Sequence, residues 1–391
     1  GSYAPSGGDI AFLTKLDQVV MELGFNQYTA HSTSTLNMVF FTMSLMIGTA
    51  GLPHVIIRFF TVPKVSDARW SAGWALVFIA LLYTVAPAVG SMARLNITST
   101  FWPNAVVGNA LDGDPISVEA INTDPDLAWI NTWKNTGLLG FEDKNGDGFI
   151  QYYNENNARM KEIAAERGWA GNELTKFDRD MLVLANPEIA KLPGWVIALV
   201  AAGGLAAALS TAAGLLLAIS SAISHDLIKG SINPNISEKG ELLAARISMG
   251  FAILLATWLG LNPPGFAAQV VALAFGLAAA TIFPVLMMGI FSKRVNKEGA
   301  IAGMLVGLIA TAIYIFLFLG WFFIPGTATL ANTPDNWLFG ISPASFGTVG
   351  AMLNFGTAYI VSGLTKAPPR EIQDLVESIR VPKGAGAATG H

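Results

Sequence analysis

The sequence contains no cysteine, which excludes disulfides, thiolate metal sites and cysteine nucleophiles. Its four histidines lie far apart and show no metal-ligand spacing. Charged residues make up only 13% of the chain, against roughly 25% in soluble domains, whereas hydrophobic residues make up 52%. This composition favours one bundle of membrane helices over a set of soluble domains.

Several chemical signatures are also missing from the sequence. It has no nucleophile–base pair, no phosphate-binding loop and no glycine-rich nucleotide fingerprint, so we do not expect an enzyme. No basic patch points to nucleic acid. The first 30 residues show no basic region followed by an apolar core, so no cleavable signal peptide is predicted.

Seven apolar runs are long enough to cross a bilayer at 1.5 Å per residue. They are Leu36–Phe60, Ser71–Ala93, Trp195–Ile223, Leu242–Leu261, Gly265–Phe291, Gly299–Phe323 and Ser345–Leu364. The sequence therefore predicts an all-α integral membrane protein with about seven transmembrane helices and one large polar loop. The expected segments are a lead-in (1–35), two spans (36–93), the loop (94–193), three spans (194–291), two peripheral spans (292–364) and a tail (365–391).

The distribution of Lys and Arg predicts the orientation of these spans. One side carries Arg58, Lys64, Arg69, Lys229, Lys239, Arg246, Lys293, Arg294, Lys297, Lys366, Arg370, Arg380 and Lys383. The short connections on the other side, around 262–264 and 325–341, carry none. We therefore expect a multi-pass plasma-membrane (inner-membrane) protein with a cytoplasmic C-terminus and a large loop outside, periplasmic in a bacterium.

The first residue of the chain is Gly1 rather than methionine. Seven crossings that end inside place Gly1 outside the cell. A membrane protein is expected to have earlier spans before such a residue, so the pattern predicts that the chain is part of a longer polypeptide.

The stretch from Leu205 to His225 carries two adjacent hydroxyls, Ser210 and Thr211, among alanines and glycines. Hydroxyl and carbonyl oxygens are the ligands that a hard cation such as Na⁺ requires. The alternative is that both hydroxyls bond back to the preceding helical turn. Composition alone leaves both interpretations open.

A second candidate region lies in GTAGLPHVIIRFF, at Gly48, Gly51, Pro53 and His54. Glycine and proline interrupt a helix, and transporters use interrupted helices to contact their solutes. A proline kink with His54 bonded to a carbonyl is the alternative. Gln269, an amide beside an apolar run, would either contact a solute or join two helices.

In the large loop, DKNGDGFIQYYN matches the first half of a calcium-binding loop. The oxygen ligands would come from Asp143, Asn145, Asp147, Phe149, Gln151 and Glu155. The closing glutamate is displaced, because position twelve is Asn154 and Glu155 follows it. A weak structural Ca²⁺ site and a metal-free turn both fit this pattern.

Three stretches in this order, GTAGLPHVIIRFFTVPKVSDARWSAGWAL, GLAAALSTAAGLLLAISSAISHDL and NPPGFAAQVVALAFGLAAATIFP, resemble the sodium/solute symporter family. Its cation/acetate-type permeases, which carry short-chain monocarboxylates, are most similar. The resemblance covers roughly Thr35 to Leu364.

The resemblance implies a leucine-transporter-like fold of two inverted five-helix repeats, of which this chain looks like the C-terminal part. The span from Leu36 corresponds to core helix six. The span with Ser210 and Thr211 corresponds to core helix eight, where Na⁺ would be bound by these two hydroxyls and the carbonyl of Ala207. Solute contacts would fall on Gly48, Thr49, Gly51, His54 and, in core helix ten, Gln269.

Core helices one to five, which carry the other half of the sodium site, have no counterpart in the chain. The implied activity is Na⁺-coupled symport of acetate or a related acid, in which the missing repeat comes from the rest of the protein or from a second subunit. H⁺ coupling through His54, a solute-sensing module and a non-transporting partner subunit remain alternatives. The expected partners are the solute and the lipid bilayer.

Overall fold

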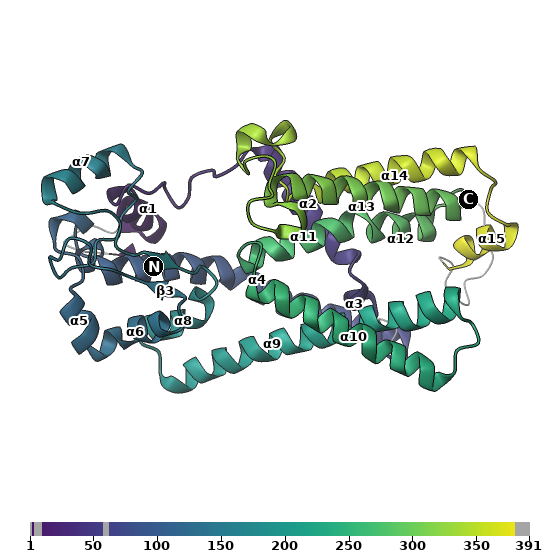
Figure 1. Ribbon diagram of the computed structural model, residues 1–391, viewed down its shortest axis with the longest axis horizontal. Coiled ribbons are helices and arrows are strands. Elements are labelled where there is room, and N and C mark those ends of the chain that lie inside the picture. Colours follow the sequence, from purple (N-terminus) through teal and green to yellow (C-terminus); the bar gives the residue numbers. More distant parts are fainter. Residues whose placement is uncertain (1, 4–9, 58–61, 380–391) are drawn as a thin grey trace, which may run out of the picture. The chain divides into compact units, whose positions relative to one another are not determined.

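The structure, a computed structural model, describes residues 2–3, 10–57 and 62–379 (Figure 1). Its α-helices are α1 (Phe12–Glu22), α2 (Thr35–Ala50), α3 (Pro53–Ile56), α4 (Val65–Phe101), α5 (Val118–Thr123), α6 (Ala128–Asn135), α7 (Ala158–Arg167), α8 (Leu182–Ile189), α9 (Gly194–Ser221), α10 (Glu238–Leu261), α11 (Ala267–Ala280), α12 (Ile282–Phe291), α13 (Lys297–Leu319), α14 (Gly347–Leu364) and α15 (Arg370–Ser378). A π-helix, η5 (Ala222–Ile232), continues from α9.

Short elements complete the description. They are the 3₁₀ turns η2 (Pro103–Ala105), η3 (Ala110–Asp112), η4 (Pro125–Leu127), η6 (Trp321–Phe323), η7 (Pro334–Asn336) and η8 (Leu338–Gly340), and the strands β1 (Ser2–Tyr3), β2 (Ile10–Ala11), β3 (Leu139–Gly140) and β4 (Lys176–Phe177). The strands form two antiparallel pairs, β1 with β2 and β3 with β4. The chain divides into a first unit, Gly1–His31 with Lys64–Ser210, and a second unit, Ser32–Pro63 with Thr211–His391.

The first unit packs the lead-in helix α1 and the large loop around one hydrophobic core. The apolar face of α1, including Leu16 and Val19, is completely buried with Phe101 and Trp102 from the end of α4. Trp102 Nε1 donates a hydrogen bond to the carbonyl of Tyr152 at 2.8 Å. The predicted span Ser71–Ala93 therefore continues into the loop as one helix, because its last turns bury their apolar side chains in this core.

The second unit is built on α2, α11, α13 and α14, which lie side by side (Figure 1). Glycines let these helices approach closely. A Cβ atom on Gly347 of α14 would lie 2.4 Å from Cα of Gly276 in α11, and one on Gly307 of α13 would lie 2.1 Å from the carbonyl oxygen of Ala280. Both contacts exclude any side chain.

Each of the seven predicted spans contains helix in its described part. Among the described residues, five helical stretches are long and apolar enough to cross a membrane: Ser66–Phe101, Gly194–Ile232, Glu238–Leu261, Ala267–Phe291 and Lys297–Leu319. The first predicted span forms the shorter apolar helix α2, and the last forms α14, of 18 residues. These elements define an all-α integral membrane protein, as the sequence predicts.

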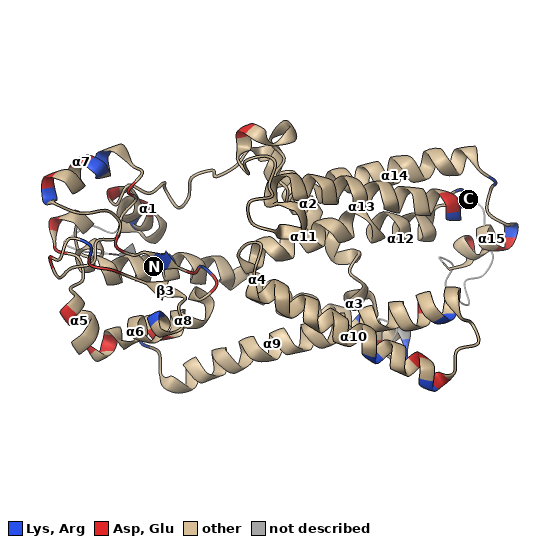
Figure 2. Ribbon diagram, viewed as in Figure 1, with Lys and Arg blue, Asp and Glu red and all other residues tan. Residues whose placement is uncertain are grey.

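Charged side chains lie mainly at the helix ends and in the loops (Figure 2). Between Gly194 and Ser221, α9 has no Lys, Arg, Asp or Glu, and α14 has none along its whole length. Arg58, Arg380 and Lys383, three of the residues on which the predicted orientation depends, lie outside the described residues.

Candidate functional site

The expected sodium residues lie on one helix, α9. Ser210 donates a hydrogen bond from Oγ to the carbonyl oxygen of Ala207 at 3.1 Å, so two of the three expected ligand oxygens are adjacent. Ser210 and Thr211 are both exposed, and no residue in the most apolar part of α9 is buried. The Ser210 hydroxyl donates to its own helix, and both lone pairs of its oxygen are still able to face a cation.

The predicted interruption of the first span is present. Helix α2 ends at Ala50 and is capped by Gly51. Leu52 is extended, with φ −81° and ψ 118°, and Pro53 begins α3. The backbone N–H of Gly51 bonds to the carbonyl of Gly48 at 2.9 Å, and that of Leu52 bonds to Thr49 at 3.4 Å. This turn therefore satisfies these two amide groups within itself.

Close packing accounts for both glycines of this turn. A Cβ on Gly48 would lie 2.3 Å from the carbonyl oxygen of Phe275, and one on Gly51 would lie 2.8 Å from that of Ala278, both on α11. Thr49 is exposed and bonds from Oγ1 to the carbonyl of Leu45 at 2.8 Å. These two positions thus let the end of the first span lie directly against α11.

His54 is the second residue of α3 and lies beside α9. Its Cβ is 3.8 Å from the position that a Cβ on Gly214 would occupy. Gly214 follows Thr211 by three residues, about one helical turn. The structure therefore places the only histidine of the predicted spans near the half of α9 that follows the hydroxyl pair.

Gln269 is on α11, but it is distant from Phe275, the residue of α11 that contacts Gly48. Its side chain folds back over the start of α11, where a Cβ on Gly265 would lie 2.5 Å from Oε1. Phe275, which contacts Gly48, lies six residues later, about 9 Å along the helix axis. The structure thus does not bring Gln269 together with Gly48.

A second helix interruption separates α11 from α12 at Thr281, whose φ and ψ are −115° and −74°. Asn354 of α14 is fully buried and donates from Nδ2 to the carbonyls of Ala280 at 2.8 Å and Thr281 at 3.0 Å. Asn354 is not among the site residues predicted from the sequence. An amide within the apolar run Ser345–Leu364 is the signal that could have identified it.

The large loop holds the expected calcium residues in a tight turn. Asp143 accepts hydrogen bonds from the backbone N–H groups of Gly146 at 2.7 Å and Gly148 at 2.9 Å. Glu155 lies at the exposed edge, where Oε2 accepts the N–H of Asn172 at 3.1 Å. Among the described residues, no three His, Cys, Asp or Glu side chains are grouped to hold a metal ion.

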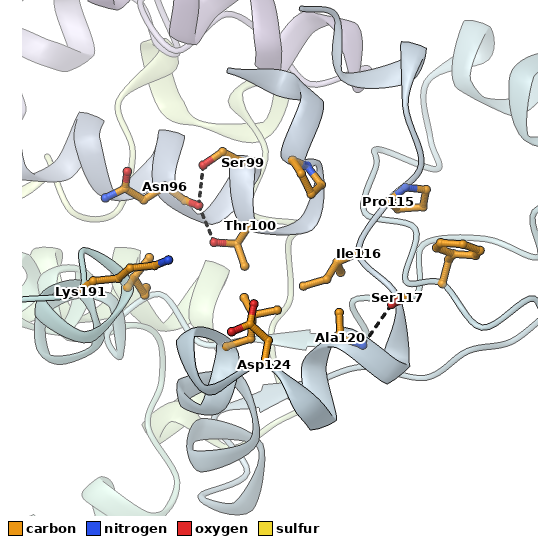
Figure 3. Close-up of a pocket in the computed structure, with 13 residues that line it drawn as sticks. Asn96, Ser99, Thr100, Pro115, Ile116, Ser117, Ala120, Asp124 and Lys191 are labelled. Atoms are coloured by element: carbon orange, nitrogen blue, oxygen red, sulfur yellow. Dashed lines mark hydrogen bonds between the residues drawn. The ribbon is translucent and has the colours of Figure 1, made fainter. Parts of the chain in front are cut away.

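A cavity of about 520 Å³ opens in the first unit between the end of α4 and α5 (Figure 3). The hydroxyls of Ser99 and Thr100 point toward it but donate to the carbonyl of Asn96, at 3.0 and 2.8 Å. Lys191 at its edge forms an ion pair with Asp126, and this hydrogen bond raises the pKa of Lys191. Because these polar groups already have protein partners, the cavity presents no convergent set for a ligand.

Among the described residues, these helices define the class, an α-helical integral membrane protein in which helix interruptions follow α2 and α11. Residues 169–307 match the model of the sodium:solute symporter family. These residues, which include α9 to α12, are therefore similar to members of the sodium:solute symporter family.

Three relatives agree with this assignment. An uncharacterized symporter of Cupriavidus necator is 36% identical over 350 residues, which cover 89% of this chain and 45% of the relative. A monocarboxylic acid transporter of Corynebacterium glutamicum is 27% identical over 76% of this chain and 41% of its own length. A sodium/proline symporter of Haemophilus influenzae is 36% identical over 31% of this chain and 25% of its own length. The chain thus spans less than half the length of each of these relatives.

Proposed function

We propose that this chain forms part of a secondary active transporter that couples Na⁺ to the uptake of a small organic solute. The observation that carries the proposal is the family match across α9, the helix on which Ala207 and Ser210 present neighbouring oxygens. Na⁺ would be held by the carbonyl of Ala207 and the hydroxyls of Ser210 and Thr211. The remaining oxygen ligands would come from the first repeat, in the same polypeptide or in a second subunit.

We propose acetate or another short-chain monocarboxylate as the solute. The support is a relative named as a monocarboxylic acid transporter, which matches 76% of this chain. The residues proposed to contact the solute are Gln269 on α11 and, at the interruption after α2, Gly48, Thr49, Gly51 and His54. Because another relative is named as a sodium/proline symporter, proline is the solute to test against acetate.

The proposed mechanism is alternating access. Na⁺ bound at α9 favours the outward-open arrangement and raises affinity for the solute, and the solute raises affinity for Na⁺ by the same factor. Movement of one bundle against the other then opens the site to the cytoplasm. An inward-negative potential adds about 2.3 kcal/mol per charge for each 100 mV.

We further propose the plasma membrane as the location, with the large loop outside and the C-terminal tail in the cytoplasm. The support is the concentration of Lys and Arg on one side of the predicted spans. The proposed segments are those expected from the sequence, with core helices six and seven before the loop and eight to ten after it.

The test is uptake of labelled acetate into vesicles that carry the protein expressed from its complete coding sequence. An inward Na⁺ gradient should drive accumulation, and unlabelled lactate and propionate should compete while proline should not. Uptake that follows a pH gradient and ignores Na⁺ would contradict the sodium assignment and favour His54. Na⁺-driven accumulation of proline alone would contradict the monocarboxylate assignment.

A solute sensor or a non-transporting subunit predicts a different result. Either would bind acetate with Na⁺-dependent affinity but would not accumulate it in vesicles. Equilibrium binding measured on the same preparation therefore separates these alternatives from a symporter.

A further inference from the structure

The turn at 143–151 in the large loop has an internal arrangement that a simple solvated turn does not require. In a calcium-binding loop of this pattern, positions 3, 5 and 9 contribute side-chain oxygens, and position 7 contributes its carbonyl. These positions are Asn145, Asp147, Gln151 and Phe149. All of them belong to the first unit.

Two amide groups converge on one carboxylate oxygen of this turn. Asp147 Oδ2 lies 2.8 Å from Nδ2 of Asn145 and 2.7 Å from Nε2 of Gln151. The polar ends of Asn145, Asp147 and Gln151, at positions 3, 5 and 9, thus lie within hydrogen-bonding distance of one another around Asp147 Oδ2. Each amide also carries an oxygen: Asn145 Oδ1 accepts the backbone N–H of Asp147 at 3.2 Å and keeps a second lone pair for a cation.

Gln151 provides the observation that points to a missing ligand. Its side chain is fully buried, and its Oε1 has no hydrogen-bond partner, although Nε2 of the same amide contacts Asp147. A buried acceptor without a hydrogen-bond partner destabilises the folded state. A cation held between Gln151 Oε1 and Asp147 would satisfy that oxygen.

Glu173 joins the two ends of the turn through their backbone N–H groups. It is fully buried, its Oε1 accepts the N–H of Lys144 at 2.7 Å, and its Oε2 accepts that of Gln151 at 3.1 Å. One carboxylate therefore joins the beginning and the end of the turn. It lies 18 residues beyond Glu155, so local spacing does not reveal it.

The turn is also fixed from the outside. Ile150 is fully buried, and its N–H donates to the carbonyl of Ile116 at 2.9 Å, while the N–H of Val118 donates to the carbonyl of Gly148 at 2.8 Å. The backbone of the turn is thus held in place without a metal ion. A cation would bind a preformed loop rather than fold it.

We propose that this turn is a Ca²⁺ site, with oxygen ligands from Asp143, Asn145, Asp147, Gln151 and the carbonyl of Phe149. Glu173 acts as a positioning residue that holds both ends of the loop. Water completes the six to eight oxygens that Ca²⁺ requires. The site takes its calcium from the same side of the membrane as the large loop, with an affinity on the order of 10⁻⁴–10⁻³ M.

The experiment is a titration of the purified full chain in detergent with Tb³⁺, a luminescent substitute for Ca²⁺, followed by displacement with Ca²⁺ or Mg²⁺. Trp169 is a suitable sensitiser, because the carbonyl of its neighbour Gly168 accepts a hydrogen bond from Asn145. We expect saturable Tb³⁺ luminescence that Ca²⁺ displaces and that Mg²⁺, which demands octahedral geometry, does not. Absence of Ca²⁺ displacement up to about 10 mM would overturn the proposal.

Three variants separate a calcium site from a structural turn. Asp147→Asn keeps an acceptor for the N–H of Phe149 but removes the charge, and should weaken Ca²⁺ binding by at least about tenfold. Gln151→Glu adds a carboxylate beside Asp147, so it should destabilise the metal-free protein and tighten Ca²⁺ binding several-fold. Glu162→Gln removes an exposed carboxylate on α7, outside the turn, and should leave binding unchanged.

Thermal unfolding with and without Ca²⁺ shows whether each variant folds. The proposal requires that Ca²⁺ raise the midpoint of Gln151→Glu more than that of the unmodified chain. Equal Ca²⁺ affinity in the Asp147→Asn variant, or no gain in Gln151→Glu, would identify the turn as purely structural.

Discussion

The Nδ2 atom of Asn354 lies 2.8 Å from the carbonyl oxygen of Ala280, at the point where α11 gives way to α12. The same nitrogen bonds to the carbonyl of Thr281 at 3.0 Å. A helix interruption frees carbonyl groups that lipid is unable to satisfy, so a buried side chain must do so. Asn354 therefore stabilises this interruption within the apolar bundle by donating to both freed carbonyls.

Replacement of Asn354 by leucine should therefore destabilise the second unit. Two buried carbonyls would lose their donor, at a cost of about 1–3 kcal/mol. The measurement is the midpoint of thermal unfolding in detergent. Met352→Leu, two residues away on an exposed position of α14, is the matched control and should leave the midpoint unchanged. An equal midpoint in the two variants would show that the interruption does not depend on Asn354.

The glycines of α14 offer a paired test of close helix packing. A Cβ on Gly347 would collide with Gly276, whereas one on Gly356 would meet nothing within 4 Å. We expect Gly347→Ala to lower the unfolding midpoint and Gly356→Ala to raise it slightly, because alanine favours a helix by up to about 1 kcal/mol. If both substitutions stabilise the protein, the close approach of α11 and α14 is not what requires glycine.

Asp17 gives the first unit a predictable dependence on pH. Burial acts to raise the pKa of Asp17, but hydrogen bonds from the side chain and backbone of Thr29 outweigh it and lower that pKa. Because the pKa of Asp17 is lower in the folded state than its unfolded value of about 3.9, the ionised carboxylate stabilises the folded state at pH values above the unfolded pKa. This stability is lost as the pH falls through the folded pKa. Asp17→Asn should accordingly lower the unfolding midpoint at pH 7 and have little effect near pH 2.

Unfolding of the unmodified chain and of Asp17→Asn should be compared between pH 7 and pH 2. Glu162→Gln, at an exposed position on α7, is the control for loss of a surface carboxylate. A difference between Asp17→Asn and the unmodified chain that stays constant as the pH falls would contradict the role of the carboxylate.

Hydropathy was sufficient to predict the helices, because lipid selects long apolar runs regardless of their neighbours. The interruption at Gly51 and Pro53 was also predictable, since both residues disturb a helix locally. By contrast, Asn354 and Ala280 are 74 positions apart, and the sequence gives no sign that they meet. Only the folded bundle reveals which carbonyls the amide satisfies.

The same limit applies to the candidate sites. The hydroxyl pair at Ser210 and Thr211 and the calcium pattern from Asp143 were readable as local motifs. The lead-in helix α1 shares a core with the large loop through Leu16 and Val19, a pairing that the sequence does not predict. Likewise, Glu173 contacts the predicted calcium-binding loop at Lys144, which lies 29 residues earlier in the sequence. Such pairings depend on tertiary structure and not on spacing.

The central claim is that the hydroxyls of α9 bind the coupling ion. The most direct test is the Na⁺ dependence of acetate uptake by vesicles carrying the protein from its complete coding sequence, compared with its Ser210→Ala/Thr211→Ala variant. Thr257→Ala in α10 is the matched control, because Thr257 is also exposed and bonds back to its own helix at 2.8 Å. We predict that the double variant loses Na⁺-driven uptake while Thr257→Ala keeps it. Unchanged Na⁺ dependence in the double variant would contradict the account.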